Sequence, residues 1–283
     1  MTSNTTKWVV GIAMSLSLSA LTACTSSSAD SQKDVAAPED CTPEHDVTTV
    51  EDGVLTVAAV NVPPVVVSSD NDFEGLEPTL IKKFAEANCL SVKANTMDFA
   101  ATIPAIQSGR ADIAIGGYYR TAERAKVVAL SNPVWLDQMG IASESGISTV
   151  DGLEDVKVGT VDGYLWVPEL QDVLGSNLTV YPSAVALKAD LDAGRIEAAV
   201  DSTALADAYD GFTMVAAEPD DRVQSTIQPA QVGFPMTMDN SSLETAVNDA
   251  IAEWQADGAV ADALTQVGMP AELAQVGEPR LIQ

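Results

Sequence analysis

The residue types that carry out most enzymatic and metal chemistry are scarce in this chain. Its 283 residues include one histidine, His45, and three cysteines, Cys24, Cys41 and Cys89. A Ser–His or Cys–His pair needs a histidine within hydrogen-bonding reach of the nucleophile, so none is expected in the folded body unless His45 docks there. The same count excludes a histidine-rich metal site. We therefore expect no catalytic residue, no metal site and no cofactor.

The charge of the chain restricts its partners. Asp and Glu number 41 against 14 Lys and Arg, which gives a formal net charge of -27. Such a chain repels nucleic acid and anionic lipid, so neither is an expected partner. With 46% hydrophobic and 19% charged residues, the chain is long and apolar enough for one large or two small cores. The composition is unlike that of a disordered chain or a membrane bundle.

The N-terminus predicts export. Residues 1–7 are polar with one positive charge, and residues 8–20 (WVVGIAMSLSLSA) are apolar or small, as in a secretory signal peptide and too short for an ordinary transmembrane helix. The next four residues, LTAC, resemble the bacterial lipobox, whose cysteine is lipidated. We predict a signal peptide at 1–23, a lipid anchor to the membrane at Cys24 and a flexible tether at 24–49. The alternative is an ordinary signal peptide with a chance cysteine.

The two other cysteines lie in the part of the chain that is expected to be exported. Cys41 lies in the last third of the tether, and Cys89 ends the first predicted helix. Because exported proteins mature in an oxidising compartment, we predict a Cys41–Cys89 disulfide. Two unpaired thiols are the alternative.

The sequence after the tether predicts an α/β architecture. Short apolar strands alternate with amphipathic helices, and this rhythm restarts after residue 145, which indicates parallel or mixed sheets in two units near 50–143 and 144–232. The expected strands are 54–60, 91–96, 112–115, 157–159, 178–181 and 197–200, and the expected helices are 78–89, 102–108, 165–174, 183–192, 203–209, 243–255 and 260–267.

Two segments then carry a family resemblance. Residues 99–133 read FAATIPAIQSGRADIAIGGYYRTAERAKVVALSNP, and a later segment reads AGRIEAAVDS. Their order and spacing resemble the amino-acid-type solute-binding proteins (family 3) of ABC importers, over about residues 52–268. The resemblance implies the type II periplasmic-binding-protein fold, in which two lobes close like a flytrap. Lobe 1 would be 50–143 plus 234–283 and lobe 2 would be 144–233, with hinge strands near Gln138–Ala142 and Gln231–Phe234.

The resemblance also implies a function. The chain would be a monomeric lipoprotein, in the periplasm or on the outer face of the cytoplasmic membrane, that binds an amino acid or a derivative and passes it to an ABC permease. It would not be an enzyme. The alternatives are a binding protein for a betaine-like or ectoine-like zwitterion, a ligand-sensing lipoprotein, and an enzyme on the same fold.

In the first half, the resemblance places an arginine clamp for the ligand carboxylate at Arg124. A planar guanidinium pairs with both carboxylate oxygens; the alternative is a surface ion pair, for instance with Glu123. Gly117 and Tyr119 belong to the same loop, whose N–H and hydroxyl groups would donate to the carboxylate. Arg120, beside them, is either a second anion contact or solvent-exposed.

Further ligand contacts follow from the same comparison. Phe99 would stack on the ligand or pack in the core, and Tyr164 and Leu165 open a helix whose N-terminus suits an anion. Asp201 would pair with the ligand ammonium. The spacing from the AGR motif is one residue short, so Ser202 is the alternative occupant, and Asp201 would then cap the next helix.

Aromatic residues are frequent among these positions. Phe99, Tyr118, Tyr119, Tyr164 and Trp166 would together give the cleft several ring faces. Ring faces attract cations, quaternary ammonium groups in particular. This is the reason for keeping a betaine-like or ectoine-like zwitterion beside a plain amino acid.

Overall fold

A computed structural model describes residues 33–35, 41–69 and 72–283 of the chain. The predicted signal peptide, the lipidation site at Cys24 and most of the predicted tether lie outside the described residues. None of the helices in the described ranges combines the length and apolarity needed to cross a membrane.

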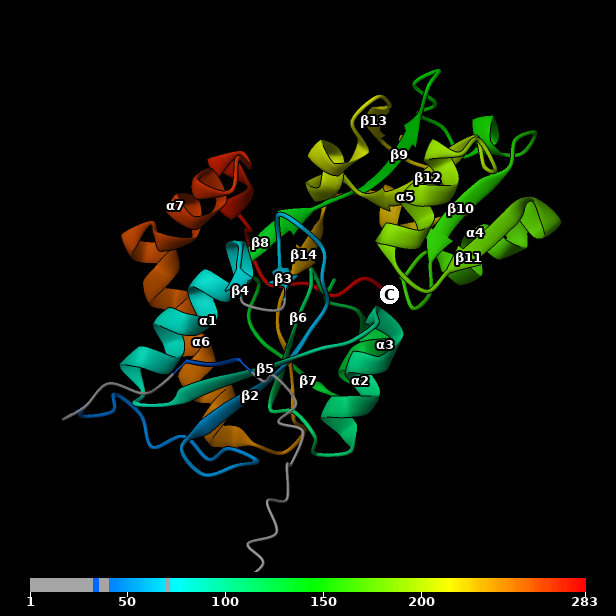
Figure 1. The fold of residues 1–283 in the computed structure, drawn as a ribbon. Coiled ribbons are helices and arrows are strands. Elements are labelled where there is room, and N and C mark those ends of the chain that lie inside the picture. Colours follow the sequence, from blue (N-terminus) through cyan, green and yellow to red (C-terminus); the bar gives the residue numbers. More distant parts are fainter. Residues whose placement is uncertain (1–32, 36–40, 70–71) are drawn as a thin grey trace, which may run out of the picture. The chain divides into compact units, whose positions relative to one another are not determined.

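The elements follow the predicted alternation (Figure 1). The strands are β1 Lys33–Val35, β2 Val54–Ala59, β3 Val67–Ser69, β4 Asp72–Glu74, β5 Ser91–Thr96, β6 Ile113–Ile115, β7 Ala129–Leu130, β8 Trp135–Asp137, β9 Met139–Ser143, β10 Val158–Val161, β11 Leu178–Tyr181, β12 Ala198–Ser202, β13 Thr213–Ala216, β14 Ala230–Val232 and β15 Pro235–Met236. The α-helices are α1 Leu76–Ala87, α2 Phe99–Gln107, α3 Ala122–Ala125, α4 Val167–Leu174, α5 Ala184–Asp192, α6 Ser241–Asp257 and α7 Ala259–Gln266. The 3-10 helices are η1 Asp151–Leu153, η2 Gly175–Asn177, η3 Thr203–Tyr209, η4 Gln224–Thr226 and η5 Ala271–Ala274.

The first lobe is built on a mixed sheet with the order β1-β5-β2-β6-β15-β7. β2 pairs in parallel with β5 and β6, and β15 runs antiparallel to β6 and β7. The residues of β2 after Val54 are all buried, as expected for a strand covered on both faces. In Figure 1, α1 and α6 lie on one side of this sheet and α2 on the other.

The second lobe is built on a mixed sheet with the order β11-β10-β12-β9-β13. β10 pairs in parallel with β11 and β12, whereas β9 runs antiparallel to β12 and β13. The two-lobed α/β fold is therefore confirmed. Most differences from the predicted elements are shifts of a few residues at element ends, but residues 203–209 form a 3-10 helix where an α-helix was predicted.

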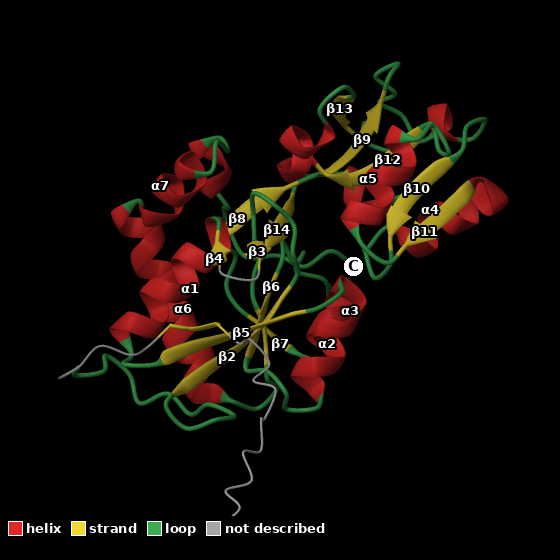
Figure 2. Ribbon diagram, in the orientation of Figure 1, coloured by secondary structure: helices red, strands yellow, loops and turns green. Residues whose placement is uncertain are grey.

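Two strands run between the sheets (Figure 2). β8 leads into β9, and β14 returns towards β15. The two strands pair antiparallel, with Gln231 opposite Leu136 and Val232 opposite Trp135. Residues of this two-stranded ribbon line a pocket and bond residues of the C-terminal tail.

The predicted disulfide is confirmed. Cys41 and Cys89 are joined, with their Cα atoms 5.6 Å apart. Cys89 follows Asn88, the C-cap of α1, so the disulfide fastens residue 41 to the end of that helix. His45 lies in the same region, where its Nε2 atom is 3.2 Å from an Asp249 oxygen. The histidine is thus held against α6 and does not line the pocket.

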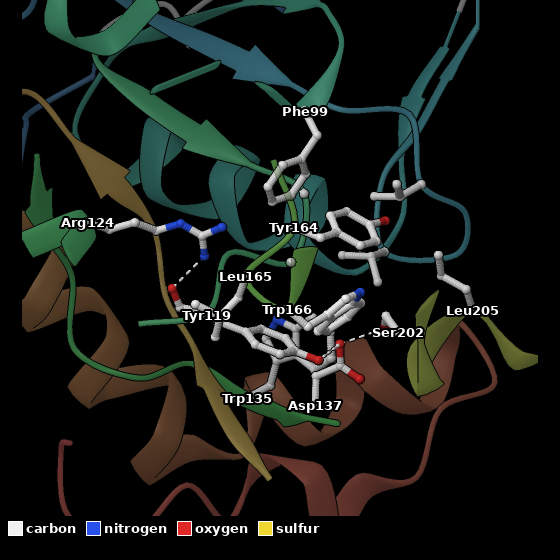
Figure 3. Close-up of a pocket in the computed structure, with 14 residues that line it drawn as sticks. Phe99, Tyr119, Arg124, Trp135, Asp137, Tyr164, Leu165, Trp166, Ser202 and Leu205 are labelled. Carbon is white, nitrogen blue, oxygen red and sulfur yellow. Dashed lines mark hydrogen bonds between the residues drawn. The ribbon is translucent and has the colours of Figure 1, made fainter. Parts of the chain in front are cut away.

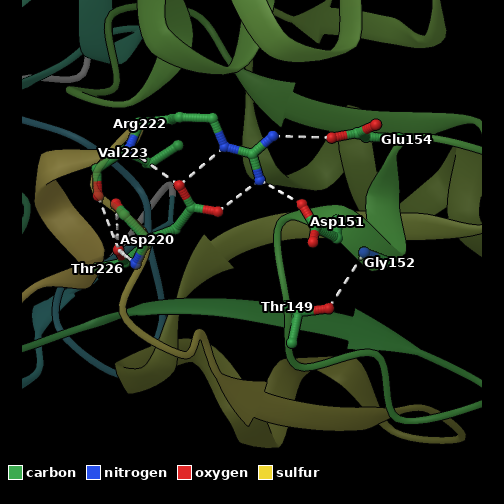
Figure 4. Close-up of polar contacts among 8 residues, drawn as sticks. All are labelled: Thr149, Asp151, Gly152, Glu154, Asp220, Arg222, Val223 and Thr226. Atoms are coloured by element: carbon green, nitrogen blue, oxygen red, sulfur yellow. Dashed lines mark hydrogen bonds and ion pairs between the residues drawn. The ribbon is translucent and has the colours of Figure 1, made fainter.

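An ion-pair cluster joins two loops of the second lobe (Figure 4). The Arg222 guanidinium pairs with Asp220 and Asp151, and its Nη1 atom lies 2.8 Å from a Glu154 oxygen. Hydrogen bonds from Arg222 lower the pKa of Asp220 to about 2. Since Arg222, Asp151 and Glu154 are exposed, the cluster contributes little to stability.

Candidate ligand-binding site

A pocket between the two sheets gathers most of the predicted ligand contacts (Figure 3). It is lined by Val62, Val65, Phe99, Gly116, Gly117, Tyr119, Arg124, Trp135, Asp137, Tyr164, Leu165, Trp166, Ser202 and Leu205. The set includes the predicted contacts Phe99, Gly117, Tyr119, Arg124, Tyr164 and Leu165, whereas Asp201, Arg120 and Tyr118 are not in it. The cavity volume is about 30 Å³, which is room for about one or two water molecules. A larger ligand therefore requires its walls to separate.

Arg124 is held in the pocket by main-chain contacts. Thr121 caps α3 by accepting the Arg124 N–H, and the guanidinium donates to Tyr119 O at 2.7 Å and to Gly163 O at 3.4 Å. Its centre lies 5.5 Å from the Phe99 ring and 5.3 Å from the Tyr118 ring, in cation–π range. Burial lowers the pKa of Arg124.

The predicted alternative for Arg124 was a surface ion pair. Glu123, its neighbour, pairs with Lys126 instead. Within residues 33–35, 41–69 and 72–283, no carboxylate forms an ion pair with Arg124. Its contacts to two carbonyls use only some of the five donors of a guanidinium, so the group retains N–H groups for an anion.

Asp137, at the end of β8, is a pocket residue that the sequence analysis missed. It is 3% exposed and accepts hydrogen bonds from Tyr119 Oη at 3.0 Å, Thr203 Oγ1 at 3.0 Å and Ser202 Oγ. Burial raises its pKa. In Figure 3, Tyr119 lies between Arg124, which binds its carbonyl, and Asp137, which binds its hydroxyl. The signal in the sequence is a single charge within the apolar run PVWLDQMGIA.

Asp201 does not line the cavity. It is fully buried and accepts hydrogen bonds from Tyr209 Oη at 2.6 Å, from Ser202 N at 2.8 Å and from the Tyr164 hydroxyl. Burial raises its pKa to about 6. Ser202 faces the pocket instead and caps η3 by accepting the Ala204 N–H at 3.0 Å. The helix cap considered for Asp201 therefore belongs to Ser202.

Aromatic rings form a continuous row through the site. Phe99 meets Tyr164 edge-on at 5.0 Å between ring centroids, Tyr164 meets Trp166 at 5.1 Å, and Trp166 meets Tyr119 at 5.9 Å. Phe99 also stacks on Tyr118 at 4.4 Å. Since Phe99 and Tyr119 come from the first lobe and the other two from the second, the row links the lobes across the pocket. Leu165 adds an aliphatic wall.

The Gly116–Gly117 turn is occupied by a buried carboxyl group. Glu77 accepts the Gly116 N–H at 2.6 Å, the Gly117 N–H at 3.3 Å and the Trp135 indole N–H at 3.1 Å. Gly117 therefore lines the cavity, but its N–H, which the resemblance assigned to a ligand carboxylate, already has a partner. Burial raises the pKa of Glu77 to about 7. Glu77 was not among the residues predicted for the site.

Arg120 points away from the pocket. It is 9% exposed and donates to Ser131 O at 2.8 Å, Gln231 Oε1 at 3.1 Å and Arg280 O at 2.7 Å. Both predicted roles for Arg120, a ligand contact and a solvent-exposed charge, were wrong. Its three acceptors are protein groups within the first lobe, the β8–β14 ribbon and the C-terminal tail.

This geometry agrees with a family match. The sequence model of the bacterial extracellular solute-binding proteins, family 3, matches residues 55–267. The chain belongs to this family. The matched range contains every residue that lines the pocket and both connecting strands.

Individual proteins and solved structures resemble the chain at low identity. The amino-acid-binding protein AabA of Dichelobacter nodosus is 24% identical over 207 residues, which cover 69% of this chain and 79% of that protein. An ancestral arginine-binding protein solved with bound glutamine is 26% identical, with a TM-score of 0.68, over 77% of this chain and 98% of that one. An ancestral amino acid-binding protein, a precursor of cyclohexadienyl dehydratase, is 21% identical, with a TM-score of 0.68, over 76% and 95%.

Proposed function

We propose that the chain binds a small polar solute, an amino acid or an amino-acid derivative, and delivers it to an ABC importer without changing it chemically. The observation that carries this proposal is Arg124, a guanidinium that lines an aromatic cavity without a carboxylate partner among the described residues. A half-buried cation that keeps free donors is suited to a ligand carboxylate, which it can bind through two parallel hydrogen bonds. The family and the names of its amino-acid-binding relatives support the same solute class.

The ligand ammonium is best assigned to Asp137. This carboxyl lines the cavity, whereas Asp201 is behind it and is bonded to Tyr209 and Ser202. A ligand with its carboxylate at Arg124 and its ammonium at Asp137 would lie along Tyr119, with Ser202 beside the ammonium. Each ligand charge would then meet an opposite charge in a site from which water is largely excluded.

A zwitterion of the betaine or ectoine kind is the second candidate. The row formed by Phe99, Tyr164, Trp166 and Tyr119 carries several ring faces. A quaternary ammonium has no N–H to donate to Asp137 and binds to such faces. This candidate keeps the same carboxylate clamp at Arg124 and differs only in how the cation is held.

The remaining parts of the proposal concern the whole protein. Lobe 1 (50–143 plus 234–283) and lobe 2 (144–233) would close on the ligand through the β8–β14 ribbon. Lipidated Cys24 would hold the monomeric protein at the membrane outside the cytoplasm, and the bound form would dock on the ABC permease. No catalytic step is included, because a binding cleft accounts for the carboxyl groups of the site.

The binding claim is tested by thermal shift and titration calorimetry on the purified protein. The ligands are the twenty amino acids, a set of betaines and ectoine, and the proteins are wild type, Arg124→Ala, Asp137→Asn and the control Arg110→Ala. Arg110 is an exposed arginine of the same lobe that bonds Ser108. A ligand that binds the folded form raises the melting temperature by mass action.

We expect at least one α-amino acid to stabilise wild type and Arg110→Ala. Arg124→Ala and Asp137→Asn should each weaken its binding roughly 100-fold, the typical cost of leaving a buried charge unpaired. Stabilisation by betaines or ectoine alone, lost in Arg124→Ala but kept in Asp137→Asn, would select the second candidate. Binding that is indifferent to Arg124 would reject the proposed site.

A further inference from the structure

The last residues of the chain pack against the elements that carry the pocket. The C-terminal strap, defined here as residues 276–283, lies beyond the family match, which ends at residue 267. Ile282 forms a parallel bridge with Thr121, and its N–H and C=O bond Arg120 O at 3.0 Å and Ala122 N at 2.8 Å. The strap is thus joined on both sides of Thr121, the residue that caps α3.

Gln231 of β14 is the main anchor of the strap. Its side chain is 2% exposed, and the amide nitrogen donates to Val276 O at 2.8 Å and to Glu278 O at 2.7 Å. The amide oxygen accepts from Arg280 N at 2.8 Å and from Arg120 Nη1 at 3.1 Å. A glutamine side chain has two N–H donors and two acceptor lone pairs. All four are used by the bonds to the strap and to Arg120.

These contacts lead directly to the pocket. α3 has four residues, too few for a helix to be stable by itself, and its first N–H is bonded to Ile282 O. Arg124 is the third residue of this helix. On the other side, the strand that contains Gln231 pairs with β8, which places Ala230 opposite Asp137.

We propose that the C-terminal strap positions the ligand-binding groups. Bonds from Ile282 fix the start of α3 and thereby the Arg124 guanidinium, and bonds to Gln231 fix the ribbon that carries Asp137. Arg120 and Gln231 are positioning residues, since both join the strap to these elements and neither lines the cavity. The role assigned to Arg124 rests on the proposed function, but the attachment of the strap to α3 is testable without any ligand.

The test compares Ile282→Pro with Gln283→Pro in the full chain. Proline removes one N–H at either position; at Ile282 this N–H bonds Arg120 O, whereas the structure gives the Gln283 N–H no bond to a described residue. Phenylglyoxal, which reacts with arginine, is applied to both variants and to wild type. Modification of Arg124 is measured by peptide mass spectrometry relative to exposed Arg110 in the same chain. Urea unfolding verifies that each variant is folded.

We expect Ile282→Pro to raise the Arg124-to-Arg110 modification ratio roughly fivefold, the factor that corresponds to one net hydrogen bond, and Gln283→Pro to leave it unchanged. Equal ratios in the two variants would overturn the proposal. If Ile282→Pro does not fold, Gln231→Ala, which loses the side-chain bonds to Val276 O, Glu278 O and Arg280 N of the strap, is compared in the same way, with the same two outcomes.

Ligand binding separates this proposal from the proposed function. Where an amino acid binds wild type, Ile282→Pro should weaken its binding roughly fivefold, by the same hydrogen-bond argument. The same substitution should not weaken binding further in a background where Arg124 is already alanine. A merely structural role would weaken both backgrounds equally and would overturn the positioning claim. If no amino acid binds, the proposed function fails, while the modification ratio still decides whether the strap holds α3.

Discussion

Glu77 is a carboxyl group without solvent contact on which three N–H groups converge. Two of the donors belong to the Gly116–Gly117 turn and one to the indole of Trp135, all of which line the pocket. The donors favour the ionised form, but burial outweighs them and raises the pKa from 4.5 to about 7. Glu77 therefore changes its charge near neutral pH, directly behind the wall of the ligand site.

This shift predicts a pH-dependent stability. The folded-state pKa of about 7 lies above the unfolded value of 4.5, so between these values the folded form holds the proton that the unfolded form has lost. The contribution of Glu77 to the free energy of unfolding thus falls as pH rises from 4.5 to 7, by about 3 kcal/mol, and is constant above. Urea unfolding of wild type and Glu77→Gln at pH 5 and pH 8 measures this, because the variant does not titrate.

The control for this measurement is Glu86→Gln, an exposed glutamate on the same helix. Because Glu77 is intact in this variant, the free energy of unfolding should fall between pH 5 and pH 8 as it does in wild type. The opposite outcome is that the free energies of unfolding of wild type and Glu77→Gln differ by the same amount at pH 5 and pH 8. That result would show that Glu77 titrates in its ordinary range, and the buried-carboxyl account would be wrong.

At the scale of elements, the sequence predicted what local patterns determine. The strands at 91–96 and 178–181 have the predicted bounds. Such strands can be predicted because short apolar runs in the local sequence indicate where a strand lies. Arg124 was found because the loop that contains it resembles the corresponding loop of the solute-binding family. Both features depend on residues near one another in the chain.

The missed residues depend on pairing between distant segments. Neighbouring side chains of a strand point to opposite faces. A shift of one residue in the alignment of β12 with the family motif therefore decides which side chain is predicted to face the pocket. Asp201 was predicted, but Ser202 lines the pocket. Asp137 reaches the site because β8 crosses between the sheets, and Glu77 because α1 packs beside the turn at Gly116. No local pattern states which of these carboxyl groups would face a cavity.

The disulfide permits a prediction about residues that do not line the pocket. Cys41 and Cys89 are 48 residues apart, and in the chain-entropy model a loop of this length stabilises the fold by about 4 kcal/mol. The double substitution Cys41→Ser/Cys89→Ser should lower the free energy of unfolding by this amount, as measured by urea unfolding. Reduction of the wild type should give the same loss.

Ligand affinity is the internal control for the disulfide variant. Neither cysteine lines the cavity, so the dissociation constant of a bound amino acid should stay within about twofold of wild type at a temperature where both are folded. An affinity loss larger than this would indicate that the end of α1 is coupled to the site, contrary to the contacts described.

At the scale of the whole molecule, the main constraint is that the pocket is nearly full of side chains. A cavity of about 30 Å³ does not admit an amino acid, so binding requires the lobes to separate and close again. On closure, Gly163 of the second lobe must approach α2 of the first. A Cβ at Gly163 would lie 3.2 Å from Ala100 Cα and from Phe99 Cδ1, closer than ordinary van der Waals contact.

Gly163→Ala should therefore hinder closure. Its φ is +81°, so alanine also strains the backbone by about 1 kcal/mol. The matched control is Gly211→Ala, whose φ is +88° and whose added Cβ would have no described atom within 4 Å. Both variants should lose similar folding stability, and only Gly163→Ala should bind the ligand weakly, by roughly tenfold or more, as expected for overpacking a close contact.

Small-angle scattering connects this affinity to lobe motion. Ligand should reduce the radius of gyration of wild type and of Gly211→Ala, whereas Gly163→Ala at saturating ligand should keep a larger radius, because the added methyl group separates Phe99 from the loop before Tyr164. Equal compaction of the two variants would mean that the lobes close without this contact. In that case the approach of Gly163 to α2 would not limit closure, and the affinity would depend on the charged groups Arg124 and Asp137 and not on this contact.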